Sequence, residues 1–312
     1  LWRAPVRGHH DVDVLEDGSV LTLAHRWRTL SRDPAGRFAS DSGRILEDFV
    51  VRLSATGEVL GRYSLVDALV ESPARRVVVP WFQRHESWDA LHANGVAMIG
   101  EDFAEHHAFA EAGQVLVSMR SLYAIGLLDL QEKRFTWLAR GGWVAQHDPD
   151  PLPNGRIMLF DNGGHPGPEG VSRILEFDPG SKRVTWSFPG TDAHPLVSGG
   201  HGGQTQLPNG NVLIAESAEG RLIEVTREGR VVWSYDHPVR AGSTGAILGP
   251  QIAGTVERFA ADELTFTPRR PPTRCDSAES NAHPTPARAP LDAGVPPDAS
   301  RRGRADGTKI AD

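Results

Sequence analysis

The stretch QHDPDPLPNGRIMLFDNG, from Gln146 to Gly163, predicts one β-strand between two tight turns, with a histidine at its entrance. A His-Asp pair leads into a Pro-Asn-Gly turn, the apolar run 157–160 follows, and Asp-Asn-Gly ends it. An apolar run bounded by such turn residues is typical of a strand. The rest of the chain can be aligned to this pattern.

The pattern recurs upstream around His10 and downstream around His201. In the copies that contain His10 and His147, the histidine lies five residues before a leucine and eight before a glycine. In the His201 copy these spacings are six and nine, so the histidine is one residue out of register. Repeats of this kind decide the fold before any single element does.

Each copy continues into two alternating strands around a turn, and the second strand ends on an aromatic residue. These hairpins span 50–63, 125–137, 173–186 and 221–233. The tryptophans at 137, 186 and 233 are 49 and 47 residues apart. A period of roughly 40 to 50 residues with about four short strands is typical of a β-propeller blade. The sequence therefore predicts an all-β propeller, with repeat units at about 9–72, 88–140, 146–188 and 201–236.

We interpret Trp2 as the end of an earlier blade, because it precedes His10 much as Trp137 precedes His147. The propeller domain is therefore predicted at 1–266, incomplete at its N-terminus and with about four to five blades visible. The Pro-, Arg- and Ala-rich segment 267–312 is predicted to be a disordered tail. Within the blades, 28–43 is expected to be an exposed loop, and 101–111 an insertion with one helical turn and exposed histidines at 106 and 107.

Composition excludes several classes of function. A formal net charge of -7 gives no basic surface for nucleic acid, and no apolar run is long enough for a membrane helix. The single cysteine, Cys275, rules out an internal disulfide. The 33 glycines and 23 prolines favour short strands joined by tight turns over long helices.

In a propeller the innermost strand of each blade lines the axis, so the residues that enter these strands open on one face. His10, His92, His147 and His201 hold that position in successive units, and we expect them to converge on one axial pocket. A single histidine beside an aspartate more often caps a turn. Four at matching positions favour a functional role.

Three motifs in order resemble the bacterial arylsulfotransferase family: Asp89–Asn94 (DALHAN), Val117–Arg120 (VSMR), and the His-Asp…Leu-Pro-Asn-Gly…Phe-Asp-Asn-Gly stretch that begins at His147. The resemblance covers roughly residues 8–260. It implies a six-bladed β-propeller that moves a sulfuryl group from a phenolic sulfate ester to another phenol without a nucleotide donor.

The resemblance also implies residue roles. His147 matches the nucleophile that becomes transiently sulfated, His10 and His92 match two further axial histidines, and Arg120 matches the arginine of a Ser-Ser-Arg-like motif. Asn94 and His201 are candidate substrate-binding residues. No metal ligand and no cofactor are assigned. The chain departs from the family with a glycine at 95, where the family tends to have serine, and a methionine at 119 for the second serine of the arginine motif.

These residue types suit sulfuryl transfer. A neutral imidazole is nucleophilic near neutral pH, and a guanidinium can stabilise the sulfuryl oxygens. A nucleotide donor would need a phosphate-binding loop, and no Gly-x-x-x-x-Gly-Lys-Ser/Thr motif occurs. The expected partners are a small aryl sulfate donor and a phenolic acceptor, with no assignment of oligomeric state. By resemblance the protein is expected to be exported, to the periplasm or the cell exterior.

Two other classes of function stay open at this point. A metal-assisted propeller hydrolase or lactonase would use axial histidines together with a carboxylate ligand. A non-enzymatic propeller would bind a protein or glycan on its face, and its axial histidines would be incidental.

Overall fold

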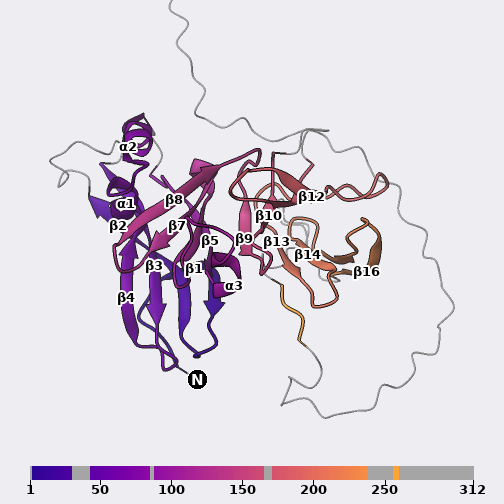
Figure 1. The fold of residues 1–312 in the computed structure, drawn as a ribbon, viewed down its shortest axis with the longest axis horizontal. Coiled ribbons are helices and arrows are strands. Elements are labelled where there is room, and N and C mark those ends of the chain that lie inside the picture. Colours follow the sequence, from indigo (N-terminus) through magenta and orange to yellow (C-terminus); the bar gives the residue numbers. More distant parts are fainter. Residues whose placement is uncertain (1, 30–42, 85–87, 165–170, 238–255, 260–312) are drawn as a thin grey trace, which may run out of the picture. The chain divides into compact units, whose positions relative to one another are not determined.

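The strands of the computed structural model form four antiparallel sheets of four strands, one sheet for each predicted repeat unit (Figure 1). The structure describes residues 2–29, 43–84, 88–164, 171–237 and 256–259. In every sheet the strands lie in sequence order, from an inner strand to the outer strand that ends the hairpin. This four-bladed β-propeller arrangement confirms the predicted all-β propeller, with four blades in the described residues.

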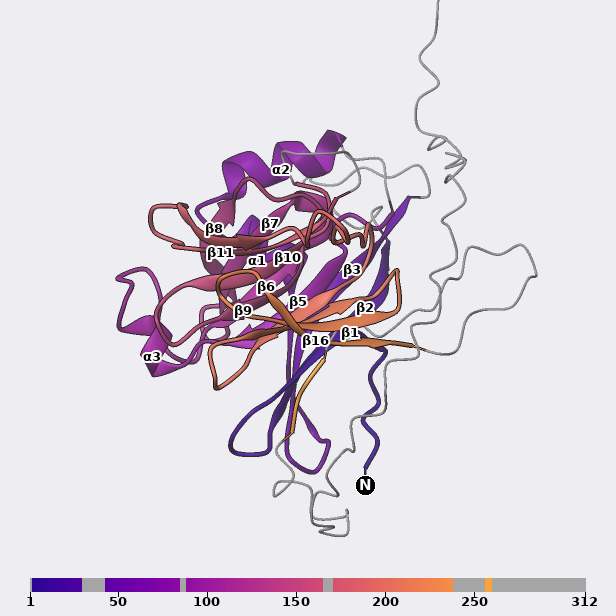
Figure 2. The ribbon, with the colours of Figure 1, turned by 90° about the vertical axis from the view of Figure 1, so that its right-hand side faces the viewer.

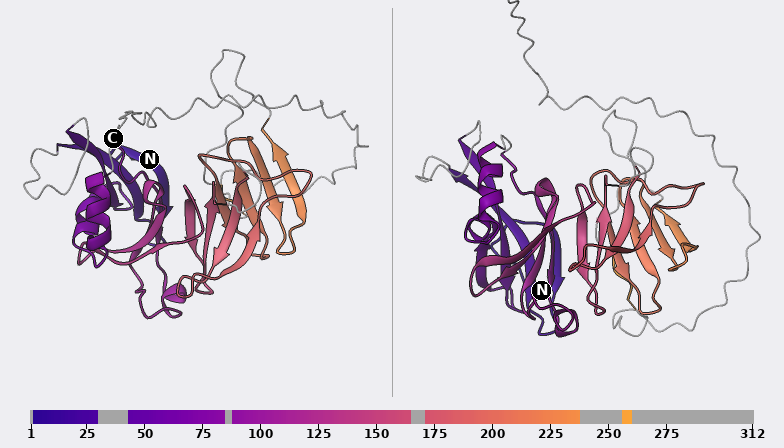
Figure 3. Two further views of the ribbon diagram at one scale, coloured as in Figure 1. Left: turned by 90° about the horizontal axis from the view of Figure 1, so that it is seen from above. Right: turned by 45° about the horizontal axis from the view of Figure 1, so that its top comes forward.

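The strand bounds follow the repeat. The first blade contains β1 (Gly8–Val14), β2 (Val20–Thr29), β3 (Arg44–Leu53) and β4 (Val59–Ser64). The second contains β5 (Ala93–Met98), β6 (Val115–Met119), β7 (Ala124–Asp129) and β8 (Arg134–Arg140). The third contains β9 (His147–Pro151), β10 (Ile157–Asp161), β11 (Arg173–Phe177) and β12 (Val184–Phe188). The fourth contains β13 (Gly203–Gln206), β14 (Val212–Glu216), β15 (Arg221–Val225) and β16 (Val231–Asp236). Figure 3 shows these sheets following one another in sequence order.

The second strand of a blade is buried on both faces, which explains its continuous apolar sequence. All five residues of β10 are buried, and the same holds for β6 and β14. Because side chains alternate along a strand, neighbours enter different cores. Ile157 and Leu159 pack with residues of the second blade, whereas Met158 and Phe160 pack with residues of the fourth. The third blade is therefore stabilised by both of its neighbours.

Two helices that the repeat did not predict follow the first blade. Helix α1 (Leu65–Val70) begins at Ser64, whose hydroxyl accepts a hydrogen bond from the backbone N–H of Asp67. Five of its six residues are buried, and it lies against β3 and β8 beside α2 (Arg75–Arg84) (Figure 2). The short helix α3 (Glu101–Ala104) is the helical turn predicted in the insertion.

Other expectations fall partly or wholly outside the described residues. These are most of the loop at 28–43, the tail at 267–312 and therefore the boundary at 266. Trp2 is not in a strand; its indole packs on Gly57 in the turn between β3 and β4, where φ is 85°. None of the described helices has the length and apolar character needed to cross a membrane.

Candidate active site

Bulges at the inner strands of the first three blades change the direction of the residues around the predicted site. On β1, His10 and Asp11 have no partners in the register with β2. The pairing of β5 shifts at Asn94, and that of β9 shifts after its first residue. The backbone is left-handed at His10 (φ 59°), His92 (φ 49°) and Asp148 (φ 50°). A bulge re-aims side chains, and here it recurs at one place in the repeat.

The structure brings together the four histidines at the strand entrances. The rings of His10 and His92 are 5.0 Å apart between centroids, and those of His147 and His201 are 5.9 Å apart. Burial lowers the pKa of His10 to about 4, with further lowering by the charges of His9, His92, His147 and His201. The other three rings thus lie within electrostatic reach of His10. His201 lies just before β13 and not within it, in keeping with its spacing in the sequence, which is one residue longer than in the other copies.

Hydrogen bonds fix the proton of His147 on one ring nitrogen. Its Nδ1 lies 2.7 Å from Oδ1 of Asn162 and 3.1 Å from the carbonyl oxygen of Ala145, and both of these atoms are acceptors. Nδ1 therefore carries the hydrogen, and the lone pair is on Nε2. His147 is only 4% exposed, and its Nε2 has no hydrogen-bond partner among the described residues. Nε2 is thus a buried nitrogen whose lone pair makes no hydrogen bond within the described part of the chain.

The orientation of Asn162 is itself determined by its neighbours. Its amide nitrogen donates to the carbonyl oxygens of Ser198 and His201, at 2.6 and 2.9 Å. Since only the NH₂ group can donate to carbonyls, Oδ1 must face His147. Asn162 belongs to the Asp-Asn-Gly turn after β10, and the sequence assigned it no role. The sequence feature that could have indicated a role for Asn162 is its position directly after a continuous apolar strand.

The surroundings of His147 keep its ring neutral. Burial, with the nearby charges of Arg120 and His201, lowers the pKa of His147 to about 4, against the opposing effect of the hydrogen bonds to Asn162 and Ala145. Arg120 begins the 3₁₀ turn η2 (Arg120–Leu122) directly after β6. Its buried Nε has no hydrogen-bond partner among the described residues. A neutral imidazole and a cation therefore lie in this site.

A carboxylate that the sequence did not assign supports His92. Nδ1 of His92 lies 2.5 Å from Oδ2 of Asp89, three residues earlier. Burial alone would raise the pKa of Asp89, but the hydrogen bond from His92 and the charges of His92, His10 and His9 lower it. An ionised Asp89 holds the proton of His92 on Nδ1, as in other carboxylate–histidine pairs.

The aspartates that follow the histidines join neighbouring blades. Oδ2 of Asp11 accepts the backbone N–H of Val96 on β5 at 2.8 Å, and Oδ2 of Asp148 accepts that of Gln204 on β13 at 2.9 Å. Inner strands have an unpaired edge, and these carboxylates supply the missing acceptors. The His-Asp pair thus combines a site residue with a structural one.

The predicted binding residue Asn94 is buried behind His147. Its amide nitrogen donates to the carbonyl oxygen of Gln146 at 2.8 Å, and its Oδ1 has no partner in the described part of the chain. The side chain of Gln146 in turn donates to Oγ of Ser118 and to the carbonyl oxygen of Ala124. These contacts tie the second blade to the residue before the nucleophile.

The two departures from the family pattern have structural reasons. Met119 is fully buried and packs in the apolar core between the first two blades, where a serine hydroxyl would need a hydrogen-bond partner. At Gly95, a Cβ atom would lie 2.5 Å from Cδ of Pro149 and 3.3 Å from Cβ of Ser118. The close approach of β5 and β9 therefore requires glycine at 95.

One of the expected exposed histidines is not exposed. His106 is exposed, but His107 is half-buried, stacks on Phe109 at 4.9 Å and hydrogen-bonds the carbonyl oxygen of Gly155 at 2.5 Å. The prediction for His107 was wrong because the insertion folds back onto the turn of the third blade. Both residues remain outside the site.

A cavity of about 700 Å³, which we call the acidic channel, lies between the four inner strands. Its lining includes Asp11, Asp13, Asp148 and Asp150, and none of the site histidines. The sulfur of a sulfate ester needs a nucleophile, and an imidazole is available only at the histidine end. We therefore place the candidate chemistry at the histidine end.

Comparison with known proteins finds one family. A family model described as arylsulfotransferase (ASST) matches residues 5–238 of this chain. Among curated protein sequences, none is significantly similar to it.

Solved structures with a similar arrangement are distant in sequence. Virginiamycin B lyase from Staphylococcus aureus has 11% identity and a TM-score of 0.39, over 74% of this chain and 56% of that chain. A protein of unknown function from Bacteroides caccae has 14% identity and a TM-score of 0.43, over 76% and 83%. The WD40 β-propeller domain of Doa1 has 12% identity and a TM-score of 0.39, over 72% and 52%. This chain thus spans little more than half the length of the lyase.

Proposed function

Because this chain belongs to the arylsulfotransferase (ASST) family, we propose that it transfers a sulfuryl group from a phenolic sulfate ester to a phenolic acceptor through a sulfated His147. The family implies a transferase with small-molecule substrates. The main observation in support of a sulfated His147 is the state of its Nε2. This nitrogen has no hydrogen-bond partner among the described residues, and the hydrogen bond at Nδ1 leaves the lone pair on Nε2. By family resemblance we also propose export, which cell fractionation with the full reading frame tests.

In the first half-reaction, Nε2 of His147 attacks the ester sulfur. An N–S bond forms, the S–O bond to the first phenol breaks, and the bonding pair leaves with the phenolate oxygen. The ring now carries a sulfuryl group on Nε2 and a hydrogen on Nδ1, and positive charge spreads over the imidazole. Oδ1 of Asn162 and the carbonyl oxygen of Ala145 accept from Nδ1 and stabilise that charge.

Arg120 faces the negative charge of the sulfuryl oxygens. Its charge is one of the causes that lower the pKa of His147, which supports a position close to that ring. Charge on these oxygens changes during transfer, and a fixed cation in a poorly solvated site stabilises it strongly. The unpartnered Nε of Arg120 is the donor that we assign to this task.

His92 is placed to move the phenolic proton. Its Nδ1–H is held by Asp89, and the carboxylate balances the charge of the ring when Nε2 also carries a proton. The protonated ring gives its proton to the departing phenolate, and the neutral ring takes one from the incoming phenol. The second phenol oxygen then forms its bond to sulfur as the N–S bond breaks, and His147 returns to its starting state. His10 and His201 complete the wall of the site, with Asn94 behind it.

Turnover of a chromogenic aryl sulfate with a phenol acceptor tests this proposal. The variant His147→Asn keeps similar bulk and loses the nucleophile, so we expect the rate of transfer to fall by about 10⁴-fold or more. The matched control is His194→Asn, an exposed histidine in the loop after the third blade, which should keep full turnover. Transfer at the normal rate by folded His147→Asn would refute the proposal.

A further inference from the structure

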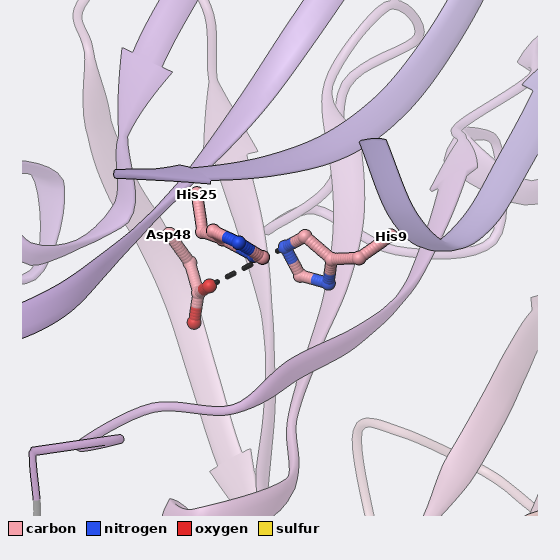
Figure 4. Close-up of side chains that lie close together, drawn as sticks. All are labelled: His9, His25 and Asp48. Atoms are coloured by element: carbon pink, nitrogen blue, oxygen red, sulfur yellow. Dashed lines mark ion pairs between the residues drawn. The ribbon is translucent and has the colours of Figure 1, made fainter. Parts of the chain in front are cut away.

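Three side chains of the first blade lie together beside the histidine site. His9 is on β1, His25 on β2 and Asp48 on β3, and Figure 4 shows them pointing toward one another. One nitrogen or oxygen atom from each lies within 4.8 Å of those of the other two. At the bulge of β1 the ring of His9 contacts both His10 and His25, with ring centroids 5.0 and 4.8 Å apart.

The cluster contains polar atoms whose contacts are incomplete. Asp48 is 1% exposed; its Oδ2 accepts the backbone N–H of Ala93 at 3.0 Å. Its Oδ1 lies 3.4 Å from Nε2 of His9, yet that buried Nε2 makes no hydrogen bond to any described group. A buried carboxylate and a buried imidazole nitrogen without a directed bond are costly. A shared ligand between them would remove that cost.

We propose that His9, His25 and Asp48 bind a divalent transition-metal cation, with Zn²⁺ as the ion that fits the donor set. Two imidazoles and one carboxylate, with an open fourth position for water, form a common protein zinc site. Tetrahedral Zn²⁺ with bonds of about 2.0–2.2 Å places its ligand atoms about 3.4 Å apart. The Nε2–Oδ1 separation already has this value, and His25 needs a small movement to join. The Ala93 N–H holds the carboxylate from outside, as outer partners of metal ligands do.

Metal binding would also set the proton positions in the adjacent site. Nδ1 of His9 lies 2.8 Å from Nδ1 of His10, so one of them donates to the other. If Nε2 of His9 binds the metal, its hydrogen is on Nδ1, and His9 is the donor. His10 then accepts on Nδ1 and carries its own hydrogen on Nε2. It becomes a fixed N–H donor beside His92. This consequence rests on the proposed function, whereas metal binding does not.

Calorimetric titration of the chelator-treated full chain with Zn²⁺ tests the site, with Co²⁺ absorption as a second measurement of the coordination. We expect one equivalent to bind with a four-coordinate Co²⁺ spectrum. His25→Gln should weaken binding by at least about 100-fold, because loss of an outer partner of a ligand already costs about 10–100-fold. Asp48→Asn should do the same, while its remaining oxygen can still accept from Ala93.

Two controls locate the ion. His194→Gln removes an exposed histidine far along the chain and should leave binding unchanged. His147→Asn removes a ring of the neighbouring histidine site and should also leave Zn²⁺ binding unchanged, although transfer is lost. The proposal is overturned if no equivalent binds, if His25→Gln binds like the wild type, or if His147→Asn abolishes binding. If Asp48→Asn unfolds, the half-buried His25 still decides the question. Failure of metal binding with intact sulfation would leave the proposed function standing.

Discussion

The nucleophilic role that we propose for His147 rests on two acceptors on one side of its ring. Asn162 and Ala145 hold the hydrogen on Nδ1, and burial keeps the ring neutral far below its ordinary pKa. A histidine with a pKa lowered to about 4 loses a proton well below neutral pH, so the nucleophile is available from weakly acid conditions upward. The acidic limb of the rate of His147 sulfation should therefore lie near about pH 4 and not near about 6.5. Stopped-flow measurement of the release of the first phenol checks this. A rate that falls with an apparent pKa near about 6.5, the ordinary value for histidine, would contradict it.

Asn162 acts through His147, and its removal should show this. Asn162→Ala leaves the ring free to rotate and to change tautomer, so we expect kcat to fall by about 10–100-fold, as for other partners that orient a catalytic histidine. KM should change little, because Asn162 does not face the substrate. Asn154→Ala, in the exposed turn before β10, is the matched control. An unchanged kcat in Asn162→Ala would remove the assigned role.

The sequence located the histidines but not the residues that orient them. His10, His92 and His147 stand out because they repeat at one position, and the resemblance gave Arg120 and Asn94. Asp89, Asn162 and the cluster of His9, His25 and Asp48 follow no repeat. Asp89 lies only three residues before its partner His92, but the partners of the other residues come from other strands or other blades, so only the folded chain brings those together.

At the scale of the strand, the bulges and one glycine determine how closely β5 and β9 approach. Gly95→Ala would place a methyl group 2.5 Å from Cδ of Pro149, so the inner strand of the second or third blade must move. We expect the free energy of unfolding to fall by about 1–3 kcal/mol, with a loss of transfer activity because the entrance of β9 carries His147. Urea denaturation measures the first effect.

The control for this substitution is Gly100→Ala. Gly100 precedes α3 with φ of -83°, and no atom lies within 4 Å of a Cβ at that position. The free energy of unfolding of this variant should stay within about 0.5 kcal/mol of the wild type, as for surface changes without a special contact. Equal stability of both alanine variants would show that the close approach at Gly95 is not required.

The strands themselves could be predicted because their pattern repeats. Outer hairpins, turn positions and the helical turn at α3 all follow local sequence. Helix α1 was missed because it follows the last strand of the first blade and has no counterpart in the other units, although Ser64 and Asp67 are a capping signal before an apolar run. The bulges have no sequence signature apart from the histidine and aspartate that occupy them.

At the scale of the whole propeller, the inner strands enclose a channel lined by carboxyl groups that the fold has largely removed from water. The pKa of Asp150 is raised to about 7. Burial is the main cause and the charges of Asp11 and Asp13 add to it, whereas a hydrogen bond from Gln204 acts in the opposite direction. An acid whose pKa is raised in the folded state binds a proton there that the unfolded chain has lost. The stability that this proton provides is complete below about pH 4 and is lost as the pH rises through about 7.

Asp150→Asn removes this titration. At about pH 8 the variant should unfold with a free energy larger than that of the wild type by roughly 1–4 kcal/mol, and at about pH 4 the difference should nearly vanish. Asp192→Asn, an exposed aspartate away from the channel, is the matched control and should behave as the wild type at both pH values. Chemical denaturation at the two pH values checks this. A variant that is less stable at the higher pH would show that the Asp150 carboxylate is held in its charged form.

Sulfation of His147 is the central claim, and intact-protein mass spectrometry tests it most directly. The full chain is mixed with an aryl sulfate in the absence of an acceptor, quenched, weighed and digested to locate the adduct. We predict a mass increase of one sulfuryl group on the peptide that contains His147, its loss on addition of a phenol, and no increase for His147→Asn. A sulfuryl group on any other residue, or its persistence in His147→Asn, would contradict the account.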